Sequence, residues 1–344
     1  MGVDSLFKFL MKRKLVRQTH INEFKGKKVA FDAAIFMHVF FYRGLGTLED
    51  VKMQWNDHTD NCKEHGIVPI VVFDGKKLKA KENEYKKRGC AEKRKRELFV
   101  EHQTKVDKMI EDLNETTTFI GGLALPKLVC FENPTPPVEV MPIKDMLPIE
   151  DTPIGSVIFT EPIKKTTLSE FAHESASLMK RKKQCEYIPS NFYDEIKTML
   201  IKNGVEIVSA PDEAERECVM LCKRKIADIV ATNDSDSLVF GAGADINLTL
   251  VTNWNTQKMS VYYLPDILTS LSLTNTQFID FCLLCGTDFS NKVAGTGPAL
   301  ALKQITEHET IDHLNALFPD AIYKEMMGDA RLIFKHEIVP EMYI

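Results

Sequence analysis

The chain has 344 residues, of which 44% are hydrophobic and 27% are charged, and its formal net charge is −5. This composition is typical of a globular protein and excludes an intrinsically disordered one. The slightly acidic balance also excludes a uniformly basic nucleic-acid binder, although a local basic patch is compatible with it. The length predicts one large domain or two smaller ones.

Neither a membrane span nor a secretory leader is predicted. No run approaches the roughly 20 consecutive apolar residues that a membrane helix needs, and the start MGVDSLFKFLMKRK has no long apolar core. We therefore expect an intracellular protein whose eight cysteines are reduced. The spacings Cys218/Cys222 and Cys282/Cys285 also occur in zinc sites, but these pairs lie in apolar helical stretches, which favours packing as small hydrophobic side chains.

Strands and helices alternate along the first hundred residues. Residues 1–24 carry leucine and phenylalanine at roughly helical spacing, which predicts a helix. Residues 27–34 and 66–75 are short apolar runs that predict buried strands ending at Asp32 and Asp74. A helix rich in phenylalanine and histidine follows the first strand, and a strongly basic helix over 76–98 follows the second.

The alternation resumes in the second half of the chain. Residues 203–224 predict a strand, a turn and a helix, with Pro211 in the first helical turn. Residues 227–236 predict a further buried strand, which runs directly into Asp234 and Asp236. Alternation of this kind predicts an α/β fold with a central, mostly parallel, twisted sheet flanked by helices.

Residues 115–184 interrupt this pattern. They include the stretch PTPPVEVMPIKDMLPIEDTPIG, in which prolines recur every few residues. Proline removes a backbone donor and clashes within a helix, so this composition excludes a long helix or a central strand. We predict a variable insert over 115–184 that is extended or folded locally on the surface.

Acidic side chains follow several predicted strands and apolar segments. In an open parallel sheet the carboxyl ends of the strands border the crevice where ligands bind. Carboxylates gathered there repel one another unless water or a cation reaches them. Carboxylate oxygens in such number suit Mg²⁺ or Mn²⁺, and two ions about 4 Å apart can activate a water and stabilise the leaving oxygen of a phosphodiester. The candidate ligands are Asp32, Asp74, Glu213, Glu215, Asp234, Asp236 and Asp288.

Seven motifs in this chain stand in the order seen in the flap endonuclease family of structure-specific nucleases. They are MGVDSL, VAFDAA, VVFDGK, APDEAE, ATNDSDSLVFG, LLCGTDF and GTGPALALKQI. The chain resembles this family over 1–97 and 185–305, and the proline-rich middle does not match. The resemblance implies a PIN-like nuclease fold with a helix-turn-helix. It also implies a phosphodiester hydrolase with two Mg²⁺ ions, for which Mn²⁺ can substitute.

The resemblance further implies cleavage of 5′ flaps or branched DNA and 5′→3′ exonuclease activity, in DNA replication, repair or recombination. All seven acids fall on the family's metal-site carboxylates. Lys81 and Arg88 are seven residues apart and therefore share a face of a helix. They fall on two basic residues that grip the scissile phosphate, where a cation offsets charge on the transferred group. The catalytic residues implied are Asp32, Asp74, Lys81, Arg88, Glu213 and Asp234.

Other positions are similar to DNA-contacting residues of the family. Gly2 matches a small residue whose amino group lies near the site after Met1 is removed. His38 falls where relatives stack an aromatic ring on a base, although a packed or surface histidine fits the sequence as well. The GTGP turn resembles the duplex-binding helix-turn-helix, whose glycines let backbone N–H groups approach a phosphate and which can hold K⁺. The DNA-binding residues implied are Gly2, His38, Gly295, Gly297 and Lys303.

We therefore predict a single nuclease domain over 1–344. Its regions are an N-terminal nuclease region with a basic arch helix (1–114), the proline-rich insert (115–184), an internal nuclease region (185–289), the helix-turn-helix (290–312) and a C-terminal tail (313–344). The expected partner is branched or flapped double-stranded DNA, without a membrane and without an evident sliding-clamp-binding peptide. The expected location is the nucleus or, for a viral protein, the site of viral DNA replication. Nothing in the sequence indicates an oligomeric state.

Three other interpretations remain open at this point. The first is a relative that cuts junctions or bubbles, which would differ in the arch region. The second is a catalytically silent DNA-binding scaffold, against which the presence of all seven acids argues. The third is an RNA-cutting nuclease with the same acid cluster, and the GTGP turn favours duplex DNA over this substrate.

Overall fold

The computed structural model describes residues 2–118, 165–254, 258–314, 321–338 and 340–343. Two compact units form. The first consists of Met1–Cys90 and Tyr187–Ile344, and the second consists of Ala91–Glu186.

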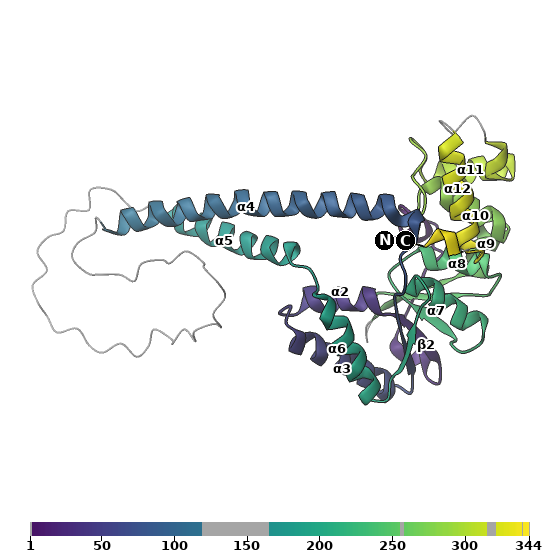
Figure 1. Ribbon diagram of the computed structural model, residues 1–344, viewed down its shortest axis with the longest axis horizontal. Helices are drawn as coiled ribbons and strands as arrows, with labels where there is room; N and C mark the ends of the chain where they lie inside the picture. Colours follow the sequence, from purple (N-terminus) through teal and green to yellow (C-terminus); the bar gives the residue numbers. More distant parts are fainter. Residues whose placement is uncertain (1, 119–164, 255–257, 315–320, 339, 344) are drawn as a thin grey trace, which may run out of the picture. The chain divides into compact units, whose positions relative to one another are not determined.

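A seven-stranded sheet in the order β1-β7-β6-β5-β2-β3-β4 lies at the centre of the first unit (Figure 1). Its strands are β1 (Arg17–Thr19), β2 (Lys28–Asp32), β3 (Val68–Phe73), β4 (Glu206–Ser209), β5 (Ile229–Ala231), β6 (Thr249–Thr252) and β7 (Met259–Tyr263). Strands β4, β3, β2, β5 and β6 pair in parallel, whereas β7 and β1 add on in antiparallel fashion. The predicted α/β fold with a mostly parallel sheet is confirmed.

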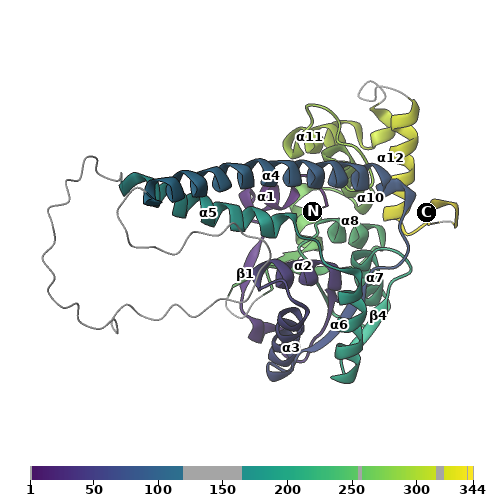
Figure 2. The ribbon, with the colours of Figure 1, turned by 60° about the vertical axis from the view of Figure 1, so that its left-hand side comes forward.

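Helices pack on both faces of this sheet, and some of them pack on other helices. They are α1 (Leu6–Lys12), α2 (Ala33–Arg43), α3 (Leu48–Glu64), α6 (Ser190–Lys202), α7 (Ala214–Lys223), α8 (Asp236–Gly243), α9 (Leu264–Leu271), α10 (Asn275–Cys285), α11 (Pro298–His308) and α12 (Ala321–Phe334). Short 3-10 turns are η1 (Ile21–Phe24), η2 (Lys79–Lys81), η4 (Ile311–His313) and η6 (Pro340–Met342). Helices α2, α3 and α6 lie together in both ribbon views (Figures 1 and 2).

The core has two parts because successive strand residues point to opposite faces. On β2, Val29 and Phe31 belong to the cluster formed with α2, α3 and α6. Ala30 between them belongs to the larger cluster formed with α1 and α7 to α12. A sheet buried on both faces explains why its strands read as continuous apolar runs. The larger cluster also contains Cys218 and Cys282, as expected for cysteines that pack as hydrophobic side chains.

Two local predictions near the chain start and before α7 are wrong. The helix predicted over 1–24 ends at Lys12, because Lys14 turns the chain with φ 58° and residues Arg17–Thr19 pair with β7. Pro211 lies in the turn before α7, since Glu213 is the N-cap of that helix.

The second unit contains a long helix where the sequence predicted none. Helix α5 (Lys165–Cys185) has 21 residues and lies mostly inside the predicted insert, and α4 (Glu82–Thr118) extends into that insert from its other side. The prediction is wrong for 165–184 because no proline occurs after Pro162 in this segment. Val106 and Ile110 of α4 pack against Leu178 of α5. The rest of the insert, 119–164, lies outside the described residues.

None of the described helices is long and apolar enough to cross a membrane alone. Helices α9 and α10 pass such a test only as a pair, across a bend of 84°.

Candidate metal centre

The carboxyl end of β2 positions Asp32. Asp32 is the N-cap of α2, and its Oδ1 accepts hydrogen bonds from the backbone N–H groups of Ala34 and Ile35 at 3.0 and 3.5 Å. Its Oδ2 accepts the hydroxyl of Thr232 at 2.9 Å. These bonds satisfy free donors at a helix N-terminus and hold the side chain, which is 3% exposed, in one orientation.

The end of β3 brings a second group of acids together. Oδ1 of Asp74 accepts the backbone N–H of Ala214, the first residue of α7, at 2.8 Å. This bond draws the N-terminus of α7 towards β3, and with it the N-cap Glu213 and the first-turn residue Glu215. Asp74, Glu213 and Glu215 each offer an oxygen, and these oxygens all lie within 4.8 Å of one another. We call these three residues the acidic triad.

A third group of acids, consisting of two aspartates, follows β5. Oδ1 of Asp234 accepts the backbone N–H of Asp236 at 2.9 Å, and Asp236 opens α8. Both side chains are buried. The two carboxylate oxygens of Asp236 have no hydrogen-bond partner among the described residues. The nearby Lys81 ammonium offsets only part of the cost of burying this charge, since the pKa of Asp236 is still raised well above its ordinary value, so this carboxylate requires a proton or a further cation.

Lys81 and Arg88 both reach the acids, although they do not share one helix. The basic helix begins at Glu82, and Lys81 belongs to the preceding turn η2. Nζ of Lys81 lies 2.5 Å from Glu213 and 3.2 Å from Glu215. Arg88 donates to Asp288 at 2.6 Å and to Glu84 of its own helix at 3.0 Å. The two cations therefore act as counter-ions to three of the predicted ligands.

The crowding of acids changes their proton affinity. Burial, with a further contribution from the Glu215 carboxylate, raises the pKa of Glu213 to about 8 and that of Asp234 to about 7. Burial and neighbouring carboxylates also raise the pKa values of Asp32 and Asp236 well above the ordinary range. Burial alone would lower the pKa of Lys81, but the surrounding carboxylates outweigh it and keep the ammonium charged.

Gly2 touches this cluster closely. Its φ is +77°, and a Cβ at this position would lie 2.2 Å from Oδ1 of Asp234 and 2.6 Å from the backbone nitrogen of Asp236. Both the backbone conformation and the lack of space require glycine here. The structure thus places the start of the chain against the two buried aspartates.

The residues expected to contact DNA lie on exposed elements of the first unit. His38 is exposed on α2, and its ring stacks on Tyr42 at a centroid distance of 5.8 Å. Gly297 is the N-cap of α11, and Gly295 has a φ of +75° in the turn that precedes it. Lys303, one turn into α11, pairs with Glu307 at 3.7 Å. In the region predicted as a helix-turn-helix (290–312) the structure has this turn, α11 and the start of η4, and the preceding helix α10 ends at Cys285.

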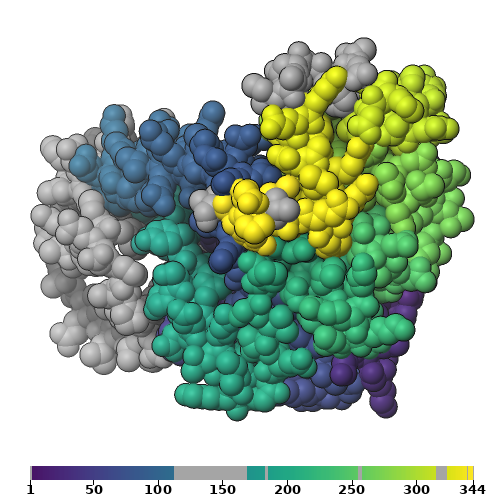
Figure 3. Space-filling view, turned by 45° about the vertical axis from the view of Figure 1, so that its right-hand side comes forward, coloured from purple at the N-terminus to yellow at the C-terminus, as the bar shows by residue number. Residues whose placement is uncertain are grey.

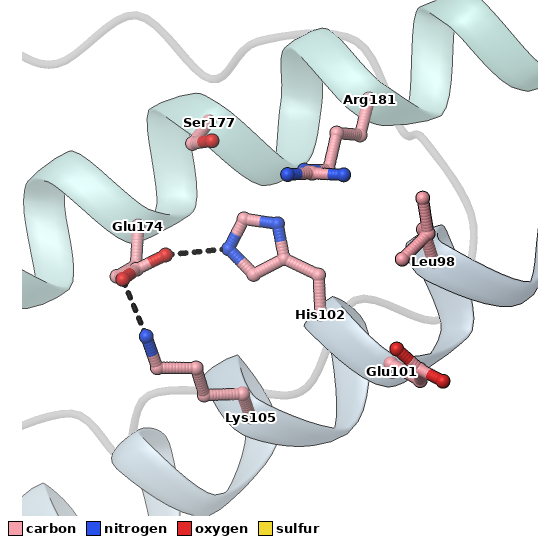
Figure 4. Close-up of a pocket in the computed structure, with 7 residues that line it drawn as sticks. All are labelled: Leu98, Glu101, His102, Lys105, Glu174, Ser177 and Arg181. Carbon is pink, nitrogen blue, oxygen red and sulfur yellow. Dashed lines mark hydrogen bonds and ion pairs between the residues drawn. The ribbon is translucent and has the colours of Figure 1, made fainter. Parts of the chain in front are cut away.

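Asp212, which is 1% exposed beside Glu213, was not among the residues predicted from the sequence. A cavity of about 380 Å³ in the second unit, between α4 and α5, was also not predicted (Figure 4). In this cavity Glu174 of α5 binds His102 and Lys105 of α4 at 2.6 and 2.5 Å. None of the predicted site residues lines this cavity. No pattern in the sequence distinguished Asp212 from the other acids of the chain.

Two family models match the chain, and together they cover more than half of it. The model described as the XPG N-terminal domain matches residues 1–96, and the model described as the XPG I-region matches residues 204–288. The chain is 24% identical to Flap endonuclease 1 of Salmo salar, covering 95% of this chain and 74% of the relative. It is 28% identical to Flap endonuclease 1 of Enterocytozoon bieneusi, covering 93% of this chain and 73% of the relative.

Solved structures share the fold. Flap endonuclease-1 from Methanococcus jannaschii aligns with a TM-score of 0.57 at 20% identity, covering all of this chain and 87% of the other. The catalytic core of Rad2 in complex with DNA substrate aligns with a TM-score of 0.55 at 16% identity, covering 99% of this chain and 82% of the other. These matches confirm the predicted PIN-like nuclease fold. The chain therefore belongs to the XPG and flap endonuclease family of hydrolytic, structure-specific 5′ nucleases.

Proposed function

We propose that this protein is a Mg²⁺-dependent nuclease that cuts 5′ flaps or branched DNA and degrades DNA from 5′ ends. It acts in DNA replication, repair or recombination, in the nucleus or, for a viral protein, at the site of viral DNA replication. Its metal ligands are Asp32, Asp74, Glu213, Glu215, Asp234, Asp236 and Asp288. The names of the relatives and the family models support this substrate class.

The observation that carries the proposal is the carboxylate of Asp236, buried without a hydrogen-bond partner among the described residues. Its charge is repelled by those of Asp234 and Asp288 and, more weakly, by that of Glu215 of the acidic triad, and it is attracted by Lys81. The donor set consists entirely of carboxylates, and hard oxygen ligands of this kind fit Mg²⁺ and Mn²⁺ rather than soft metals. When bound, two such ions supply a water of lowered pKa and stabilise charge on the phosphoryl oxygens.

The chain's own cations orient the phosphodiester. Lys81 is 4% exposed and is held between Glu213 and Glu215, so its Nζ is already placed within the site. Arg88 is held by Asp288, another proposed ligand. The Lys81 ammonium and the Arg88 guanidinium could both donate hydrogen bonds to the scissile phosphate when bound ions neutralise the carboxylates that hold them. Placed cations of this kind offset charge that develops on the transferred group.

The helix-turn-helix binds the duplex at a distance from the reaction. The backbone N–H groups around Gly295 and Gly297 open the N-terminus of α11, a position that favours a phosphate oxygen. Lys303 adds positive charge one turn further on, and the turn can hold K⁺. The exposed ring of His38, stacked on Tyr42, offers a surface for a DNA base.

The first test is cleavage of an end-labelled 5′-flap duplex, with Mg²⁺ or with EDTA, by the wild type and by Asp234→Ala. We expect a short product that requires Mg²⁺ and is absent with the variant, because Asp234 is a proposed ligand. The length of the product reports the position of the cut.

Matched substrates separate the alternatives. Preferential cleavage of a four-way junction or a bubble would assign a different branched substrate, and cleavage of an RNA flap would assign an RNA nuclease. Binding of every substrate without any cleavage would overturn the nuclease proposal and favour a DNA-binding scaffold.

Metal binding is expected to depend on pH through the crowded acids. The folded-state pKa values of Glu213 and Asp234 are about 8 and about 7, above their ordinary values of 4.5 and 3.8. The folded protein thus binds more protons than the unfolded chain between about pH 4 and pH 8, so the metal-free protein loses stability as the pH rises. Mg²⁺ competes with these protons and therefore binds more tightly at pH 8 than at pH 6.

The melting temperature in EDTA should fall from pH 6 to pH 8. The rise in melting temperature on adding Mg²⁺ should be larger at pH 8 than at pH 6. A ligand at a hundred times its Kd adds about 2.7 kcal/mol of stability. Asp234→Asn should reduce both trends, whereas Asp266→Asn, an exposed acid at the start of α9, should leave them unchanged. An Mg²⁺ effect of equal size at both pH values contradicts the expectation.

A further inference from the structure

A buried carboxylate, Asp212, holds the turn that carries Glu213. Its Oδ1 accepts the backbone N–H of Glu213 at 2.8 Å. Its Oδ2 accepts Nη1 of Arg216 at 2.7 Å and the hydroxyl of Tyr343 at 3.0 Å. The Asp212 side chain is fully shielded from solvent. Three donors, one of them charged, hold this carboxylate in place and offset the cost of its burial.

Arg216 connects this carboxylate to the helix that begins at Asp236. Nε of Arg216 donates to Nδ1 of His336 at 3.2 Å, and Nε2 of His336 donates to the carbonyl of Phe240 on α8 at 3.0 Å. These partners assign the neutral tautomer with its proton on Nε2. Burial lowers the pKa of His336, in agreement with a neutral ring. The polar chain therefore joins α7 and α8, the helices that open with proposed metal ligands.

The C-terminal segment, residues 340–343, holds the Asp212 end of this network of hydrogen bonds. Tyr343 forms an antiparallel β-bridge with Leu78, and Nζ of Lys76 lies 5.9 Å from the centre of its ring. The backbone N–H groups of Gly75 and Lys76 donate to the carbonyls of Asp212 and Pro211 at 2.6 and 3.0 Å. The same turn is thus held from two sides. Figure 3 shows the last part of the chain, in yellow, on the surface of the molecule.

Tyr343 can serve as a donor throughout the working range of pH. Partial burial and the neighbouring Asp212 raise the pKa of its hydroxyl above the ordinary value. The hydroxyl therefore stays protonated at neutral pH and donates to the carboxylate. Loss of this donor would leave Arg216 as the remaining side-chain partner of Oδ2 among the described residues.

We propose that Tyr343 and Asp212 are positioning residues for the metal centre. The Tyr343 hydroxyl holds the Asp212 carboxylate, which holds the backbone at Glu213 and thereby orients the carboxylates of Glu213 and Glu215. The inference rests on the proposed function, because these two acids are proposed metal ligands. It makes the C-terminal segment part of the framework of the nuclease site.

The decisive variant is Tyr343→Phe, which removes one hydroxyl and keeps the ring. Mn²⁺ binding is measured by titration calorimetry, and flap cleavage is measured as a function of Mg²⁺ concentration. We expect the half-saturating concentration of either ion to rise about threefold to tenfold, since partners that orient metal ligands have effects of this order. The rate of cleavage at saturating Mg²⁺ should stay near that of the wild type. The affinity for the flap duplex, measured in Ca²⁺, should also be unchanged.

Two further variants separate positioning from general stability. Tyr263→Phe removes the hydroxyl of a tyrosine that is 39% exposed on β7, and it should change neither metal affinity nor cleavage. Asp212→Asn should raise the half-saturating Mn²⁺ concentration by itself. In that background Tyr343→Phe should have little additional effect, because the two residues act through one contact.

The outcomes distinguish this inference from the proposed function. Wild-type Mn²⁺ affinity in Tyr343→Phe would overturn the positioning role, as would a lowered melting temperature with unchanged metal affinity. Additive effects of the two substitutions would overturn the coupling. A wild type that binds Mn²⁺ and cuts no branched DNA would overturn the proposed function instead, while the Mn²⁺ titrations would still decide the role of Tyr343.

Discussion

Asp236→Asn is expected to abolish cleavage and, at the same time, to stabilise the metal-free protein. The side chain is 0% exposed, and neither of its oxygens has a hydrogen-bond partner among the described residues. Asparagine has nearly the same shape without the charge, so the folded metal-free protein no longer has to protonate a buried carboxylate, whose pKa is raised well above its ordinary value. Stability in EDTA at neutral pH should therefore increase by more than about 1.4 kcal/mol, the free energy of a one-unit pKa shift. Removal of a proposed ligand should reduce cleavage by at least about a hundredfold, because even partners of ligands have effects of this order.

The measurements are the melting temperature in EDTA and in Mg²⁺ and the rate of flap cleavage. Asp280→Asn is the matched control, since Asp280 is also 0% exposed but binds Arg331, Thr310 and the backbone of Ile311. This control should lose stability in EDTA and keep its response to Mg²⁺. A fall in the EDTA melting temperature of Asp236→Asn would contradict a destabilising buried carboxylate, and cleavage at the wild-type rate would show that the acid has no role as a metal ligand.

Gly2→Ala is expected to reduce cleavage strongly, with a loss of stability of about 1–2 kcal/mol from its backbone conformation. A Cβ at Gly2 would lie 2.2 Å from Oδ1 of Asp234, so either this carboxylate or the start of the chain must move. A displacement of about 1 Å at a reacting centre can cost on the order of a hundredfold in rate. The test compares the rate of flap cleavage and the affinity for Mn²⁺ with those of the wild type.

Gly26→Ala provides a close control for the backbone strain. Its φ is +79°, nearly that of Gly2, but a Cβ there would meet no atom within 4 Å. Alanine in this conformation costs about 1–2 kcal/mol at either position. Equal losses of activity in the two variants would attribute the effect to strain and contradict a close contact with Asp234.

The sequence by itself determined the class of the fold and the set of candidate residues. Apolar runs ending at Asp32 and Asp74 predict β2 and the end of β3 correctly, because a parallel strand buried on both faces is continuously hydrophobic. The motifs indicated the family, which the family models and the fold confirm. The roles of the individual acids, of Lys81 and Arg88 and of the DNA-contacting residues stay predictions, and the variants above test those of Gly2, Asp234 and Asp236.

Pattern reasoning failed where long-range contacts outweigh local preference. The apolar spacing over 1–24 indicates a helix, yet Arg17–Thr19 pairs with a strand more than 240 residues later in the chain. The prolines of the insert end at Pro162, and α5 forms beyond them because Leu178 and Phe171 pack against α4. Periodicity reports neither of these partners.

The tertiary structure alone decided how the acids divide and what holds them. Asp74, Glu213 and Glu215 converge because Asp74 accepts the first backbone N–H of α7, whereas the Asp236 carboxylate at the start of α8 is buried without a hydrogen-bond partner among the described residues. The contact between Asp212 and Tyr343 joins residues 131 positions apart. Bonds of this kind depend on the distances between elements once the sheet has formed, and a sequence pattern carries only local spacing, so it cannot specify them.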